Sequence, residues 1–177
     1  MEHGSHYLSS AQHKINSGSN QQLVTTSPTR TDTDLFWIIS AGHGLNACEP
    51  GTKIAFGSKT RLTHMNTGSN LHSHLYKSPL THNQEVTGFG DEGNGDSGDN
   101  WVVNPVRSSG SYWKRDQVVN ISHPDTGKNL GSSQRGMFTR ENCGNRCPLM
   151  NHLEVFAASG NASTMQWKAK HGIYLSI

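Results

Sequence analysis

The chain has 177 residues, a formal net charge of +2, 16% charged residues and 32% hydrophobic residues. This length suits one domain, and the polarity comes from Gly, Ser, Asn and Thr instead of charge, which excludes the usual disordered chain. Because Lys and Arg are spread out and no apolar run reaches about 18 residues, the sequence favours neither a nucleic-acid partner nor a membrane span.

Short strands are expected throughout the chain. Gly numbers 19, and no window of about 12 residues repeats apolar side chains at the helical spacing of three and four. Turn-forming residues separate the short apolar runs. We therefore predict a single all-β domain over residues 1–177.

The first part of the chain, at about residues 1–48, is a weak copy of a repeated unit. It contains Leu8 and Val24 and ends on Trp37 after a turn-rich loop. The strand that should open this copy has no clear counterpart before Leu8. We expect the first strand to be missing or atypical.

Two clearer copies follow, at about residues 49–108 and 109–177. Residues 62–71 read LTHMNTGSNL and residues 121–130 read ISHPDTGKNL. Both segments read as strand, turn and strand, because Gly supplies the positive φ of the turn at the same position in each.

Each copy closes on one tryptophan: Trp37, Trp101 or Trp167. The third copy carries ten extra residues between Leu130 and Pro148. Three units of about 60 residues, none able to bury its apolar face alone, favour a closed three-fold barrel. The predicted architecture is a β-trefoil with each tryptophan in the hydrophobic layer and its indole N–H paired.

Several strings of the second copy carry a family resemblance. RLTH at 61–64, NLHSH at 70–74, SPL at 78–80 and NQEV at 83–86 resemble the stromal cell-derived factor 2 family of MIR-domain proteins. The resemblance implies a β-trefoil of three MIR repeats in the endoplasmic reticulum lumen, without catalysis or cofactor. It also implies association with a DnaJ-type co-chaperone and lumenal Hsp70 machinery.

The chain departs from the family at Cys48 and at its two ends. Family members carry a second cysteine shortly after this position, where the chain has IAFG at 54–57. The start lacks the layout of a signal peptide, and residues 174–177 carry no retention signal. Lumenal retention is therefore expected to depend on a partner or on residues outside this sequence.

Three residues of the second copy, His72, His74 and Tyr76, are candidates for binding a ligand or partner. The two histidines should share one face of a strand, and His64 on the neighbouring strand could add a third metal ligand. A hydrogen-bonded structural role and a contact with glycan or polypeptide are the alternatives. Because the third copy has Gly131-Ser132-Ser133 there, the fold does not require the pair.

We interpret the pair as an exposed partner-binding site and expect no metal. Replacing both histidines by alanine should then weaken partner binding while leaving the melting temperature almost unchanged.

The cysteines Cys143 and Cys147 lie inside the longer third copy. Their spacing permits a local disulfide in an oxidising compartment, whereas zinc would need two more ligands and a redox site usually has CxxC. Cys48 would then be an unpaired and buried thiol.

An acidic run and two sequons complete the candidates. Residues 88–100 hold four acidic side chains but lack the spacing of a calcium loop, which predicts a solvated hairpin loop. N-glycosylation sequons begin at Asn120, in an expected strand, and at Asn161, in an expected loop. Only Asn161 is a candidate for glycosylation.

The sequence supports no enzyme class, because it has neither a G-x-S-x-G elbow nor carboxylates assignable to facing strands. The leading hypothesis is a non-enzymatic lumenal accessory protein that binds chaperone and co-chaperone partners in glycoprotein folding and quality control. The alternative is a β-trefoil lectin for mannose-type glycans, with Tyr76 as the aromatic platform. Unfolded polypeptide is the other ligand considered.

Overall fold

The computed structural model describes residues 1–14, 18–30, 33–91, 94–107 and 110–172, so Glu92 and the C-terminal residues 174–177 lie outside it. Its strands are β1 (Glu2–His3), β2 (His6–Lys14), β3 (Gln22–Ser27), β4 (Trp37–Ala41), β5 (Lys59–His64), β6 (Asn70–Lys77), β7 (Gln84–Phe89), β8 (Trp101–Pro105), β9 (Val119–His123), β10 (Lys128–Met137) and β11 (Leu153–Ala158). Its helical turns are η1 (Thr33–Leu35), η2 (Ser97–Asp99), η3 (Ser163–Met165) and α1 (Arg140–Cys143). None of these described helices has the length and apolarity that crossing a membrane requires.

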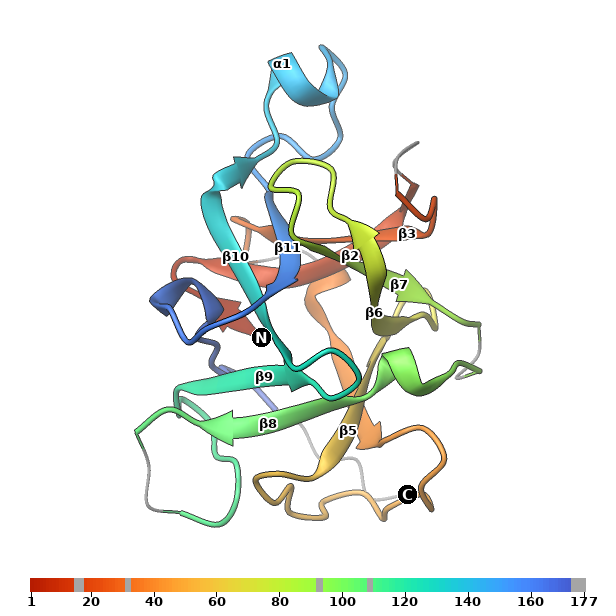
Figure 1. The fold of residues 1–177 in the computed structure, drawn as a ribbon, viewed down its shortest axis with the longest axis vertical. Helices are drawn as coiled ribbons and strands as arrows, with labels where there is room; N and C mark the ends of the chain where they lie inside the picture. Colours follow the sequence, from red (N-terminus) through yellow and green to blue (C-terminus); the bar gives the residue numbers. More distant parts are fainter. Residues whose placement is uncertain (15–17, 31–32, 92–93, 108–109, 173–177) are drawn as a thin grey trace.

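Three hairpins, β2–β3, β6–β7 and β10–β11, meet around one axis (Figure 1). Their second strands pair with one another in a closed triangle. The pairs that close it are Leu23 with Thr87, Glu85 with Phe156, and Glu154 with Thr25. Each strand thus repeats the contacts of the other two, and the predicted all-β trefoil of three repeats is confirmed.

The remaining strands form the barrel beneath this triangle. β5 pairs with β4 and β8, and β8 pairs with β9. Single bridges from Val119 to Trp167 and from Glu2 to Lys168 place the closing segment of the third copy between β9 and β1. The first and third copies are therefore joined by backbone hydrogen bonds.

The opening strand of the first copy is present as the two-residue strand β1. Its last residue, His3, stacks on Trp167 with a centroid distance of 5.2 Å. The other opening strands end on histidines that make the same contact, His64 on Trp37 and His123 on Trp101. β1 is hard to find in the sequence because Leu8 follows His3 by five positions, whereas the corresponding leucines follow the other two histidines by seven.

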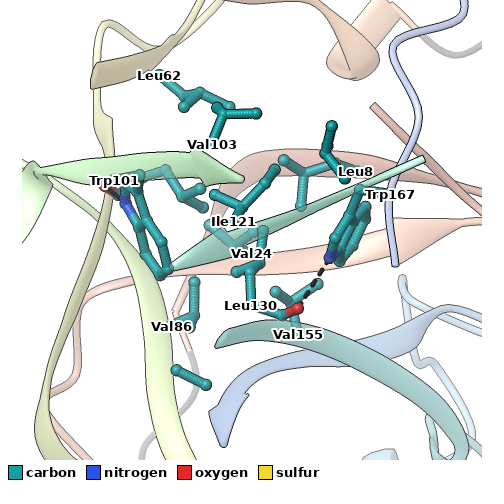
Figure 2. Close-up of a cluster of buried hydrophobic side chains, with 13 residues drawn as sticks. Leu8, Val24, Leu62, Val86, Trp101, Val103, Ile121, Leu130, Val155 and Trp167 are labelled. Carbon is teal, nitrogen blue, oxygen red and sulfur yellow. Dashed lines mark hydrogen bonds between the residues drawn. The ribbon is translucent and has the colours of Figure 1, made fainter. Parts of the chain in front are cut away.

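The tryptophans anchor the main hydrophobic core (Figure 2). Trp101 and Trp167 are completely buried, and Trp37 packs partly buried against the cluster. Each indole N–H donates to a leucine carbonyl of its own copy, at 3.1 Å for Trp37, 2.8 Å for Trp101 and 2.9 Å for Trp167. The expected placement of these three tryptophans in the hydrophobic layer with paired indoles is confirmed, with Trp37 at its edge. Burying each neighbouring Leu or Val contributes about 1.5–3 kcal/mol.

The tip of each hairpin packs against a position on the central triangle that belongs to another copy. Glu85 on β7 holds the β2–β3 tip, because Ser19 donates to its carboxylate from the backbone N at 3.2 Å and from Oγ at 2.7 Å. Glu154 on β11 holds the β6–β7 tip through Ser78 Oγ at 3.0 Å and the Leu80 backbone N at 2.7 Å. Buried carboxylates thus lock two of the three hairpin tips.

The third position on the central triangle, on β3, carries an apolar side chain instead of a carboxylate. The extra residues of the third copy supply the apolar groups that cover it. Leu23 occupies it and packs with Phe138 and Leu149 from the β10–β11 tip. Cys143 and Cys147 are joined by a disulfide and pack against the same small cluster. The extra residues therefore build a second, disulfide-linked core over the axis.

The remaining cysteine, Cys48, is exposed and unpaired, so the expectation that it would be buried is wrong. Phe56, in the segment where the family usually has a second cysteine, packs partly buried against the main core. Its side chain contributes apolar burial at the base of the barrel.

Candidate functional site

The candidate binding residues His72, His74 and Tyr76 lie in a row along β6. Their ring centroids are 5.1 Å and 5.0 Å apart, and His72 also lies 4.6 Å from Phe89. Alternate residues of a strand face the same side, so the expectation that the two histidines share a face is confirmed. The row runs from the buried His72, which contacts the half-buried Phe89, to the surface at Tyr76.

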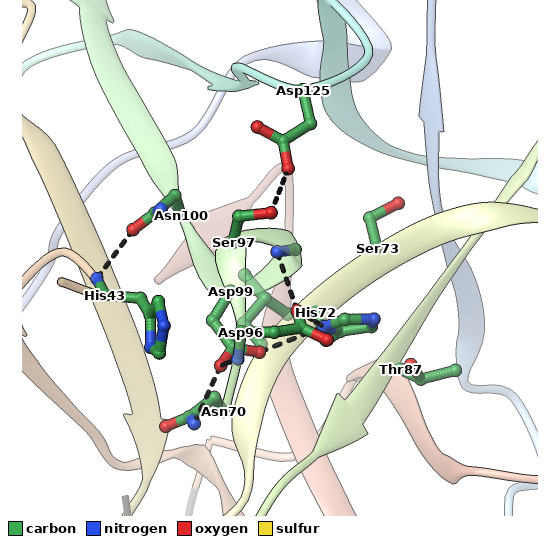
Figure 3. Close-up of polar contacts among 12 residues, drawn as sticks. His43, Asn70, His72, Ser73, Thr87, Asp96, Ser97, Asp99, Asn100 and Asp125 are labelled. Atoms are coloured by element: carbon green, nitrogen blue, oxygen red, sulfur yellow. Dashed lines mark hydrogen bonds and ion pairs between the residues drawn. The ribbon is translucent and has the colours of Figure 1, made fainter. Parts of the chain in front are cut away.

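The inner end of the row is buried, which corrects the expectation of an exposed histidine pair. The side chain of His72 is 6% exposed, and its Nδ1–H donates to Asp99 Oδ1 at 3.0 Å (Figure 3). Asp99 is fully buried and also accepts from Asn70 Nδ2 at 3.1 Å and the Asp96 backbone N at 3.0 Å. His72 is therefore held inside the molecule.

The same geometry corrects the prediction for residues 88–100, which were expected to be a solvated loop. Asp96 and Asp99 cap the short turn η2 reciprocally, because each side chain accepts from a backbone N–H of the turn. The cap turns Asp99 inward while Asp96 stays exposed. Sequence spacing could not show this, since the partner of Asp99 lies 27 residues earlier in the chain.

The third copy builds the equivalent position from apolar groups. A Cβ on Gly131 would lie 2.8 Å from Phe156 Cε2 and 3.2 Å from Met165 Cγ. Gly131 and Met165 thus stand where the second copy has His72 and Asp99. The polar pair is one of two ways in which this fold fills the space.

His74 completes the binding of a buried carboxylate. Its Nε2–H donates to Glu85 Oε2 at 2.7 Å, beside the two donors of Ser19. Within the described residues, the donors to the equivalent carboxylate, Glu154, come from the β6–β7 tip, and the third copy has no histidine there. His74, with its side chain 19% exposed, keeps only an edge at the surface.

The outer end of the row is open to solvent. Tyr76 is 55% exposed, and its neighbour Leu75 is 83% exposed. The strand pairing shifts between Ser73 and Lys77, and the three consecutive residues 75–77 are exposed at this irregular end of β6. Sequence reasoning missed Leu75, because a register shift cannot be read from alternation alone.

One group of side chains in the described part could accept a cation. His72, Asp96 and Asp99 each offer one ligand atom, and these atoms lie within 4.8 Å of one another. Their oxygens already accept hydrogen bonds from η2 and from His72, which accounts for the cluster without an ion. His64, considered as a third ligand, lies elsewhere and contacts Thr67 Oγ1 at 2.9 Å.

The two sequons differ in access. Asn120 is buried in β9, and its Nδ2 donates to the Met165 carbonyl at 3.0 Å. Asn161 is exposed before η3, with its Oδ1 accepting from Asn129 Nδ2 at 3.0 Å. An enzyme that modifies the side-chain nitrogen can reach only Asn161.

Comparison with known proteins assigns the architecture to a family. The MIR domain matches residues 3–100. Human stromal cell-derived factor 2 is 40% identical over 162 residues, 92% of this chain and 71% of the relative. The crystal structure of the SDF2-like protein from Arabidopsis thaliana superposes with a TM-score of 0.85 at 35% identity, covering 95% of this chain and 87% of that one.

A more distant match is a chain in the structure of the S. cerevisiae protein O-mannosyltransferase Pmt1–Pmt2 complex bound to the sugar donor. It has a TM-score of 0.76 at 26% identity and covers 93% of this chain but only 23% of that one. The same fold therefore also occurs as one part of a much larger protein.

Proposed function

The chain belongs to the stromal cell-derived factor 2 family of MIR-domain proteins, and from this membership we propose that it is a non-enzymatic accessory protein of the endoplasmic reticulum lumen. In this role it binds a DnaJ-type co-chaperone and, through it, the lumenal Hsp70 machinery during glycoprotein folding. The binding surface is the outer end of the β6 row: His74, Leu75 and Tyr76.

The observation that carries this proposal is the exposure of two adjacent large side chains near the end of β6. Leu75 and Tyr76 present an apolar and an aromatic group at 83% and 55% exposure. Aromatic side chains are enriched at protein interfaces, and an apolar anchor gains most when a partner removes it from water. The β6–β7 hairpin is held by Glu154, so its tip is pre-ordered for binding.

Two features support the non-enzymatic and lumenal parts of the proposal. The buried histidines and carboxylates of the row are paired with each other, which suits structural more than catalytic groups. The Cys143–Cys147 disulfide and the exposed Asn161 sequon suit an oxidising secretory compartment.

A binding experiment with purified components tests the proposal. Immobilised wild-type chain should retain a purified lumenal DnaJ-type co-chaperone, and the double variant Leu75→Ser, Tyr76→Ala should bind about tenfold more weakly or worse, the loss expected for an interface hot spot. Ile38→Ser, at a similarly exposed apolar residue on β4, is the matched control and should bind like wild type.

Equal binding of wild type and the double variant would place the interface elsewhere. Absence of binding by the wild type would overturn the partner class. A glycan array probed with the same proteins tests the lectin alternative, for which Tyr76 is the only exposed ring of the row.

A further inference from the structure

An apolar surface lies where the last strand of the first copy, β4, pairs with the opening strand of the second copy, β5. Its members, Phe36, Ile38 and Met65, are 54%, 55% and 62% exposed. Phe36 and Ile38 point to the same side of β4, and the Met65 backbone N donates to the Phe36 carbonyl at 2.9 Å. At the corresponding positions the second junction has Asn100, Val102 and Pro124, and the third has Gln166, Lys168 and Gly4. The fold therefore does not require an apolar surface at this place.

β4 is an edge strand. Among the described residues it pairs with β5 only, whereas β8, its counterpart in the second copy, pairs with both β5 and β9. The Phe36 carbonyl and the Gly42 backbone N form hydrogen bonds with β5 or with the residue after it. Backbone groups alternate in direction along an antiparallel strand, so those of Trp37, Ile39 and Ala41 face the other edge.

The barrel is less well closed along this edge than at the equivalent places. Thr60 pairs with Trp101, and Val119 pairs with Trp167, whereas no described residue pairs with Trp37 on this edge. Trp101 and Trp167 are completely buried, but Trp37 is only partly buried. A small side chain opposite Trp37 would complete the burial of its indole.

The edge also lacks the residues that normally prevent one edge strand from pairing with another. Soluble proteins protect such edges with Lys, with other charged side chains or with Pro. Residues 35–42 read LFWIISAG and contain none of these. An apolar edge without such protection favours pairing with a further strand.

The sequence of β4 is complementary to itself in size. Two copies of the strand can pair antiparallel with a two-fold axis at Ile39. Trp37 then lies opposite Ala41 of the other copy, and the two residues exchange backbone hydrogen bonds. Ile38 lies opposite Ser40. Each large side chain thus meets a small one, and no charged residues of the two strands come together.

We propose that a second copy of the chain pairs with the β4 edge in this register and forms a two-fold symmetric dimer. Ala41 of the second copy then takes the place opposite Trp37 that Thr60 and Val119 take opposite the other two tryptophans. The contact uses the same edge of both copies, so it closes without forming a filament. A formal net charge of only +2 opposes the association weakly.

Sedimentation analysis of the full chain at increasing concentration tests the proposal. Wild type should change from one copy to two copies of the 19.4 kDa chain. Ile38→Lys should weaken the dimer about tenfold or more, because it places two ammonium groups close to the axis in place of apolar side chains. Val102→Lys is the matched control on β8 and should dimerise like wild type, because both edges of that strand are already paired.

A pair of cysteines tests the register. In a Cys48→Ser background, the double variant Ile38→Cys, Ser40→Cys should form a covalent dimer on oxidation, because the two positions lie opposite each other in the two copies. The control pair on β8, Val102→Cys with Asn104→Cys, should give no covalent dimer. Thermal melts check that each variant is folded.

The dimer surface on β4 is separate from the proposed partner surface on β6, so either proposal can fail without the other. Ile38→Lys should therefore still bind the co-chaperone. The dimer proposal is overturned if wild type stays monomeric over its whole soluble concentration range, or if the dimer persists in Ile38→Lys. A wild-type dimer that the Ile38→Cys, Ser40→Cys pair fails to cross-link would overturn the pairing of the two β4 strands.

Discussion

His72 and Asp99 form a 3.0 Å hydrogen bond inside the second copy, at the place where the third copy packs Gly131 against Met165. The two pairs fill equivalent space with opposite chemistry. A polar pair of this kind is stable only as a pair, because either partner alone would be a buried group without its main contact.

The first prediction concerns the stability of this pair. His72→Ala should lower the free energy of unfolding by about 2–4 kcal/mol, since it leaves a cavity and strips a buried carboxylate of a donor. This reverses the expectation that histidine replacements in the row leave the melting temperature unchanged. Urea denaturation of His72→Ala, Asp99→Asn and the double variant should give a coupling of about 1–2 kcal/mol. His43→Ala, at an exposed residue, is the control. Strictly additive losses would contradict the pairing.

The second prediction concerns pH. Burial lowers the pKa of His123 below its ordinary value of 6.5, and its Nε2–H donates to the Gly98 carbonyl at 3.1 Å. The folded state therefore favours the neutral ring. Its contribution to stability is complete above pH 6.5 and is lost as the pH falls through the lower pKa of the folded protein. The melting temperature should fall on acidification below pH 6.5.

His123→Gln should make that fall shallower, because the variant has no proton to take up at this position. His6, whose pKa is also lowered by burial, contributes in the same direction, so His6→Gln is the comparison. An unchanged pH dependence in both variants would show that other groups control acid stability.

The fold could be predicted from sequence because its repeated signals are local. Strand, turn and strand recur with His, Gly and Leu at fixed spacing, and each copy closes on a tryptophan, so packing and pattern agree. The opening strand of the first copy, β1, was not recognised, because the turn after it differs in length from the other two. The second and third copies each end their opening strand on a histidine, His64 or His123, that contacts a tryptophan. Searching for the same histidine near the start of the chain would have located His3 and with it the opening strand.

The interior of the candidate site could not be predicted, because it depends on distant partners. His72 meets Asp99 across 27 positions, and His74 shares Glu85 with Ser19 from another copy. Alternation places the two histidines on one face, but it does not say whether that face is covered. His72 is buried because η2 packs over it, whereas Tyr76 remains exposed at the end of β6.

The third prediction concerns the cysteines. Alkylation of the native, non-reduced protein should label Cys48 alone and rapidly, because that thiol is exposed while Cys143 and Cys147 are joined. Replacing both linked cysteines by serine should cost about 2 kcal/mol, the loop-closure contribution of a short disulfide loop. Mass spectrometry of peptides checks the pairing, and a Cys48 linkage to either partner would contradict it.

The last prediction concerns glycosylation of Asn161. When the chain is directed through a eukaryotic secretory pathway, Asn161 should carry an N-linked glycan and Asn120 should not, since one side chain is exposed and the other is buried with its Nδ2 donating to Met165. Asn161→Gln should remove the endoglycosidase-sensitive mass shift completely. Ser122→Ala, which destroys only the Asn120 sequon, should leave the shift unchanged. Because the fold buries Asn120 as it forms, glycosylation there would require modification before β9 is in place. A glycan found at Asn120 in the folded product would therefore contradict the placement of this residue.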